Sequence, residues 1–94
     1  MGFSSRRANP VFSEEYQLLR EILVEARQAA GVSQRGLGAR IGKTASHVCM
    51  IETGQRRIDT LEFYKVARSV GVEPVELFER LSARLDDLAK AEGA

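Results

Sequence analysis

Apolar residues recur at helical spacing along most of the chain, interrupted by short stretches that contain glycine or proline. The clearest set would line one face of a helix: Leu18, Leu19, Ile22, Leu23 and Ala26. A later set would give another helix its inward face: Leu61, Phe63, Val66, Ala67 and Val70. Long Val/Ile/Thr alternation, the mark of a half-buried strand, is missing from the sequence. The pattern therefore predicts an all-α fold.

Residues typical of helix ends divide the pattern into five helices. Four side chains are placed to cap a helix: Ser13, Ser33, Thr44 and Asp59. Pro74 suits the first position of the last helix, because its fixed φ matches the helix and its missing N–H is not needed there. We expect the first helix to begin after the Ser13 cap and to stop at Gly31. The second would span 34–41, the third would run from the Thr44 cap to about 52, the fourth from the Asp59 cap to Gly71, and the fifth from 74 to about 90.

Two glycines lie inside the second predicted helix. Gly36 and Gly38 each cost about 1 kcal/mol relative to alanine. Gly38 would allow the third helix to cross closely, since it has no Cβ, whereas the sequence offers no reason for Gly36. The Gly36→Ala variant should melt at a higher temperature if this position is exposed, and at a lower one if it lies in a contact.

The segment from Ser33 to Gly54 predicts two short helices joined by a tight turn at Gly42. Two short helices set at a steep angle around a glycine turn form the helix-turn-helix, whose second helix enters the DNA major groove. Sequence-specific DNA binding is therefore the function that this segment predicts.

The charge distribution favours the same function. Residues 20–57 carry seven Lys or Arg against three Asp or Glu, whereas residues 58–94 carry five against eight. The chain as a whole has a net charge of only +1. Positive charge therefore gathers around the predicted motif, where DNA phosphates would lie.

Length and composition limit the number of domains and the cellular compartments that are open to this protein. A chain of 94 residues is one domain by length. No apolar run approaches the ~20 residues that cross a bilayer, and no apolar segment follows the basic residues near the N-terminus. The single cysteine cannot form an internal disulfide. We expect a cytoplasmic protein, associated with the nucleoid when it is bound to DNA.

One set of residues in and after the motif follows a known arrangement. Its members are Gln34, Gly38, Gly42, Val48, Ile51 and the segments IETGQRRID (51–59) and LEFYKVARSVGVEPVELF (61–78). With them, residues 18–78 resemble the phage-repressor and Cro-type helix-turn-helix family, also called the XRE type. The resemblance implies a five-helix lambda-repressor-like DNA-binding domain, here with an extended C-terminal helix.

The resemblance also implies that the start and exposed face of the third predicted helix read the bases. The residues concerned are Thr44, Ala45, Ser46, Cys49 and Met50. None of them is an Arg, Lys, Gln or Asn that could contact guanine or adenine with two hydrogen bonds. We therefore expect specificity to rest on apolar contacts with thymine methyl groups and on DNA shape. Met50 could instead be a core residue.

Contacts with phosphates are expected at the helix start, the turn and the basic loop after the motif. The candidates are Ser33, Gln34, Arg35, Lys43, His47, Gln55, Arg56 and Arg57. Gln34 would combine its side-chain donor with the backbone N–H groups of a helix N-terminus, a natural anion site. Arg56 and Arg57 could instead be solvated side chains that do not contact DNA. Near the N-terminus, Arg6 and Arg7 could enter a minor groove or belong to a tail that does not contact DNA.

Other chemistry has little support. A redox switch at Cys49 would need a neighbour that stabilises its thiolate, and the sequence supplies none. His47 has no second histidine with which to share a metal ion. The lone His and Cys both lie on the predicted recognition helix, with no nucleophile and base pairing suggested. We expect no enzyme activity, no metal and no cofactor.

The last helix carries an apolar stripe that suggests a homodimer. Its members are Leu77, Phe78, Leu81, Leu85 and Leu88, which fall on an a/d-like pattern. We expect a flexible arm at 1–12, a DNA-binding domain at 13–78 with its motif at 34–53, and a dimerisation helix at 74–91. The stripe could instead fold back onto its own domain.

The leading hypothesis is a homodimeric transcriptional regulator, a repressor, that binds double-stranded DNA at an inverted repeat. The alternative is an antitoxin-like or adaptor protein that uses the same fold mainly to hold a protein partner.

Overall fold

The computed structural model describes residues 13–93, and these form five helices without a strand. The helices are α1 (Glu14–Ala29), α2 (Gln34–Ile41), α3 (Ala45–Glu52), α4 (Thr60–Ser69) and α5 (Pro74–Gly93). The predicted all-α architecture is confirmed, and α5 continues past the expected end at Lys90. The expected N-terminal arm, with Arg6 and Arg7, lies outside the described residues. No helix in 13–93 is both long and apolar enough to cross a membrane.

All four predicted N-caps are present. The side chains of Ser13, Ser33, Thr44 and Asp59 each accept a hydrogen bond from the backbone N–H three residues further on, at 2.8–3.1 Å. At α4, Glu62 reaches back to the backbone N–H of Asp59 and completes a capping box. Each cap stabilises its helix by about 1 kcal/mol, since it satisfies a backbone donor that has no partner within the helix.

The turn between α2 and α3 depends on two glycines. Gly42 ends α2 with φ of 75°, a left-handed conformation that costs glycine little. At Gly38, a Cβ would lie 2.8 Å from the carbonyl oxygens of Lys43 and Thr44. The close approach expected at Gly38 is thus made by the turn that leads into α3. A Cβ at Gly36 would lie 3.2 Å from the Ser33 hydroxyl oxygen, so Gly36 also sits at a contact.

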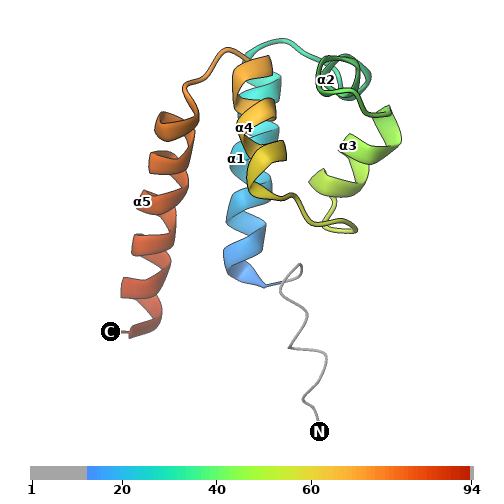
Figure 1. Cartoon of the computed structure of the whole chain (residues 1–94). Coiled ribbons are helices and arrows are strands. Elements are labelled where there is room, and N and C mark those ends of the chain that lie inside the picture. The colour runs from blue at the N-terminus through green and yellow to red at the C-terminus, as the bar shows by residue number, and fades with distance from the viewer. Residues whose placement is uncertain (1–12, 94) are drawn as a thin grey trace, which may run out of the picture.

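The helices surround one apolar core, with α5 on one side of α1 and α4, and α2 and α3 on the other (Figure 1). Every helix contributes to it. The buried apolar residues are Ile22, Leu23, Ala26, Val32, Leu37, Ile41, Val48, Ile51, Val66, Ala67, Val70, Leu77 and Leu81. Burial of these side chains supplies the main driving force for folding. The core thereby fixes α3 against α1 and α2, with its other side directed outward.

The structure corrects three expectations about the apolar stripes. Leu77 is 0% exposed and Leu81 is 7% exposed, so both belong to the core of their own chain and cannot form a dimer surface. Leu85 packs partly against the same core. Conversely, Leu61 was expected to face inward but is 70% exposed. Leu77, Leu81 and, in part, Leu85 thus pack against their own domain, whereas Phe78 of the same stripe is 55% exposed.

Candidate nucleic-acid interface

Helix α3, the predicted recognition helix, is anchored through one face. Val48 and Ile51 lie three residues apart on α3, and both are buried as predicted. Thr44 caps the helix from the turn, where its hydroxyl accepts a hydrogen bond from the backbone N–H of His47 at 3.1 Å. The anchoring residues and the cap together fix both the axial rotation and the start of α3.

The candidate base-reading residues lie together at the start and outer side of α3, and none of them belongs to the core. Thr44 and Ser46 are exposed, whereas Ala45, Cys49 and Met50 are half-buried. Met50 is therefore partly accessible rather than a core residue. The face is small and mostly apolar, so its polar contacts with bases are limited to hydroxyl and thiol groups.

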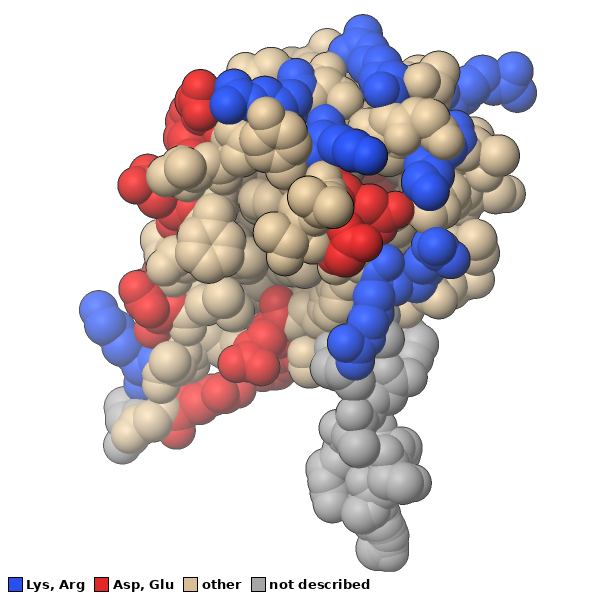
Figure 2. Space-filling model, viewed as in Figure 1, with Lys and Arg blue, Asp and Glu red and all other residues tan. Residues whose placement is uncertain are grey.

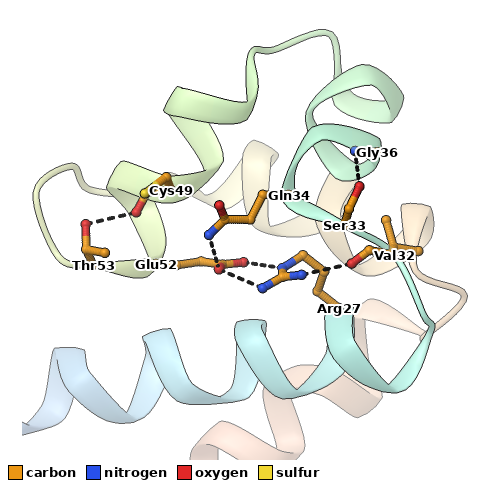
Figure 3. A network of polar contacts seen from close by, with 8 residues as sticks. All are labelled: Arg27, Val32, Ser33, Gln34, Gly36, Cys49, Glu52 and Thr53. Carbon is orange, nitrogen blue, oxygen red and sulfur yellow. Dashed lines mark hydrogen bonds and ion pairs between the residues drawn. The ribbon is translucent and has the colours of Figure 1, made fainter.

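A polar network beneath this face joins three helices (Figure 3). Arg27 of α1 binds the Glu52 carboxylate of α3 through two nitrogens, at 2.6 and 3.0 Å. Arg27 also donates to the backbone carbonyl of Val32 at 2.9 Å, and Gln34 of α2 donates to Glu52 at 2.9 Å. The side chains of Arg27 and Glu52 are only 11% and 7% exposed. The network therefore locks the start of α2 to the end of α3.

This network changes the expected role of Gln34. Its side-chain amide was expected to point toward a phosphate, but it donates a hydrogen bond to Glu52 instead. The backbone N–H groups at the start of α2 remain the better placed anion donors there, since Gln34 opens the helix. The Ser33 hydroxyl also has a local task, because it accepts the hydrogen bond of the Gly36 backbone N–H.

The structure corrects the assignment of His47 to phosphate. Its side chain was expected at the edge of the exposed face, but the residue is only 9% exposed. Its Nε2 lies 2.9 Å from a carboxylate oxygen of Glu62 on α4. The imidazole is thus turned into the protein and ties the recognition helix to α4.

The loop that follows α3 is held from both ends. The Thr53 hydroxyl donates to the carbonyl oxygen of Cys49 at 2.9 Å, and Gln55 donates to Thr53 at 3.1 Å. At the far end, the backbone N–H of Ile58 donates to the Tyr16 hydroxyl at 2.7 Å. Between these two anchors, the candidate phosphate-binding residues Arg56 and Arg57 are exposed.

The basic candidates are exposed side chains in and around α2 and α3. Arg35, Lys43, Arg56 and Arg57 are all exposed, and they belong to α2, the turn and the loop after α3. Figure 2 shows Lys and Arg mostly over the upper and right side and Asp and Glu mostly over the left and lower side, with one acidic cluster in the middle beside the basic groups. Such a separation favours the approach of a polyanion to the α2–α3 side.

Several positioning residues were missed in the sequence. Arg27 and Glu52 are 25 positions apart, and Glu62 is 15 positions from His47. Arg40 of α2 donates to the carbonyl oxygen of Ser69 at the end of α4, at 2.7 Å. Side-chain pairs at such separations follow no helical spacing, so only the folded chain reveals them.

Comparisons with known proteins agree with this geometry. A helix-turn-helix family model matches residues 23–77. Among solved structures, the chain is similar to an XRE-family like protein from Pseudomonas syringae pv. tomato str. DC3000, with 38% identity and a TM-score of 0.73. That alignment covers 85% of this chain and 98% of the other. The comparison with curated proteins gave no match. The chain therefore belongs to the Cro-type (XRE) helix-turn-helix family of DNA-binding regulators.

Proposed function

We propose that this protein is a transcriptional repressor that binds an inverted-repeat operator as a homodimer. The observation that carries the proposal is the outward face of α3, which is rigidly held and flanked by exposed basic residues. A helix presented in this way suits insertion into the major groove. A repressor needs no chemistry beyond occupancy of its site.

Base reading is assigned to Thr44, Ala45, Ser46, Cys49 and Met50. Ala45, Met50 and the Thr44 methyl group would contact thymine methyls, and Ser46 would hydrogen-bond a base edge. Because this face carries none of the residues that form bidentate contacts with bases, DNA shape contributes much of the specificity.

Phosphate binding is assigned to the exposed residues around this face. They are Ser33, Arg35, Lys43, Gln55, Arg56 and Arg57, together with the backbone N–H groups at Gln34. These contacts set the register of the protein on DNA without carrying sequence information. Each cation that neutralises a phosphate adds about one unit to the salt dependence of binding.

The test is selection of bound sequences from random duplex DNA, followed by titration of the selected site at several salt concentrations. We expect a recurring inverted repeat. Recovery of no motif, with only salt-sensitive binding to all duplexes, overturns the proposal.

Two variants separate the assigned roles. Arg57→Ala should weaken binding to all sequences and reduce the salt slope by about one unit. Met50→Ala should change the selected sequence while the slope stays the same. Lys90→Ala is the matched control, because it removes an exposed positive charge from the distant end of α5. If Met50→Ala changes only the slope, the two faces are wrongly assigned.

A further inference from the structure

Four large apolar side chains remain exposed on α4 and α5. Leu61 is 70% and Tyr64 49% exposed on α4, and Val75 is 68% and Phe78 55% exposed on α5. The two residues of each pair lie three apart and share a helix face, and α4 and α5 contact each other. We call these four residues the α4–α5 patch. Figure 2 shows uncharged side chains gathered over the region of α4 and α5.

We propose that the α4–α5 patch is the surface through which two copies of this chain associate. The inference rests on the homodimer of the proposed function, but it assigns the interface to residues other than those of the α5 stripe. Leu77 and Leu81 of that stripe are already buried in their own chain, so a dimer must use what they leave exposed. Of the stripe, Phe78 alone also belongs to the patch.

The apolar area of the patch matches the needs of a dimer. The four exposed fractions leave on the order of 400 Å² of apolar surface open to water. A standard interface takes about 800 Å² from each partner, of which roughly 60% is apolar. The patch therefore supplies most of the apolar part, with polar neighbours as the rim.

The charges around the patch favour a second copy as the occupant. Positive charge flanks the α4 half, because Lys65 lies four residues after Leu61 and the Arg68 guanidinium lies over the Tyr64 ring, 5.3 Å from its centroid. Glu79 flanks the α5 half, four residues after Val75. Both Lys65 and Glu79 are exposed. A twofold arrangement that sets α4 of one copy against α5 of the other brings these opposite charges together twice. A partner of a single charge would meet repulsion at one of the two halves.

A groove next to Phe78 gives the interface an anchoring point. It has a volume of about 200 Å³ and is lined by residues of α1, α4 and α5 together with the end of the loop before α4. Leu19, Phe63 and Phe78 form its apolar walls. Apolar side chains buried in such pockets carry much of the binding energy of interfaces. We assign the groove to an apolar side chain of the second copy. The outer face of α3 stays free, since no patch residue belongs to α2 or α3.

The test compares three proteins by sedimentation equilibrium across micromolar concentrations. The wild type should have the mass of two chains, and Phe78→Lys the mass of one. Ala83→Lys is the matched control, because Ala83 is exposed on α5 but outside the patch, and it should remain a dimer. Melting temperatures establish that Phe78→Lys is folded. A wild-type mass of one chain, or a Phe78→Lys dimer as tight as that of Ala83→Lys, overturns the assignment.

A charge exchange tests the arrangement of the two copies. Lys65→Glu and Glu79→Lys should each weaken the dimer about fivefold, and the double variant should restore it. If the double variant is as weak as the single ones, α4 of one copy does not face α5 of the other, and the proposed arrangement is wrong.

DNA binding separates this inference from the proposed function. Phe78→Lys should prefer the same bases as the wild type but bind the inverted repeat about 10²- to 10⁴-fold more weakly, because its second half-site contact is no longer linked to the first. A wild type that dimerises through the patch but selects no DNA motif would contradict the proposed function alone. A wild type that binds its selected inverted repeat as a dimer, with Phe78→Lys dimerising just as tightly, would contradict the interface alone.

Discussion

The pairing of Arg27 with Glu52 allows a quantitative test of how the recognition helix is held. Glu52→Met should lower the free energy of unfolding by about 3 kcal/mol, because it leaves a guanidinium that is 11% exposed without its carboxylate. Arg27→Met should cost about 2 kcal/mol, since Gln34 still donates to Glu52. Such losses are a large share of the 5–15 kcal/mol that stabilise a typical domain.

The double variant carries the decisive information. Replacing both Arg27 and Glu52 by methionine removes both buried charges and should cost less than about 1 kcal/mol, so the coupling energy is about 3 kcal/mol or more. Urea denaturation followed by circular dichroism measures all four proteins. The exposed pair of Arg80 with Glu76, 3.2 Å apart within α5, is the control and should show coupling below about 0.5 kcal/mol. Additive losses at Arg27 and Glu52 would refute this account of the network.

Two further predictions concern stability. Gly38→Ala should lower the melting temperature more than Gly36→Ala in calorimetry, because the new Cβ at position 38 meets rigid backbone carbonyls at 2.8 Å; an equal effect at both positions would contradict this. The hydrogen bond from Arg84 holds the pKa of Glu25 below its ordinary value of 4.5. This ion pair therefore stabilises the fold above pH 4.5, and the contribution is lost as the pH falls below that value. Arg84→Gln should make acid unfolding slightly less steep in a pH titration, and only slightly because both groups are exposed.

Local features were predictable because they depend on neighbours in sequence. A cap side chain bonds to a backbone group three residues away, so Ser33, Thr44 and Asp59 mark helix starts without knowledge of the fold. The left-handed turn at Gly42 is likewise a local property of glycine. The motif, the all-α class and the family were therefore open to inference from the order of residues.

The roles of individual side chains were less predictable, because a helix face acquires its partner only when other helices pack on it. Helical spacing placed Leu61 inward and Leu77 at a dimer surface, whereas packing exposed the first and buried the second. Apolar character alone does not reveal which side of a helix its neighbours will cover.

In the recognition helix, too, some features depend on neighbours in sequence and others on the packing of distant helices. Its start, its length and its apolar anchors follow from residues 44–52 alone, because caps and helical periodicity act within a few positions. The contact of His47 with Glu62 and the ion pair of Glu52 with Arg27 form only when α4 and α1 pack beside α3. Ion pairs join groups that the chain separates widely, and their distances are set by how the core closes. Local chemistry thus identifies this protein as a DNA-binding regulator, and long-range packing decides which side chains remain free to meet DNA or a second copy.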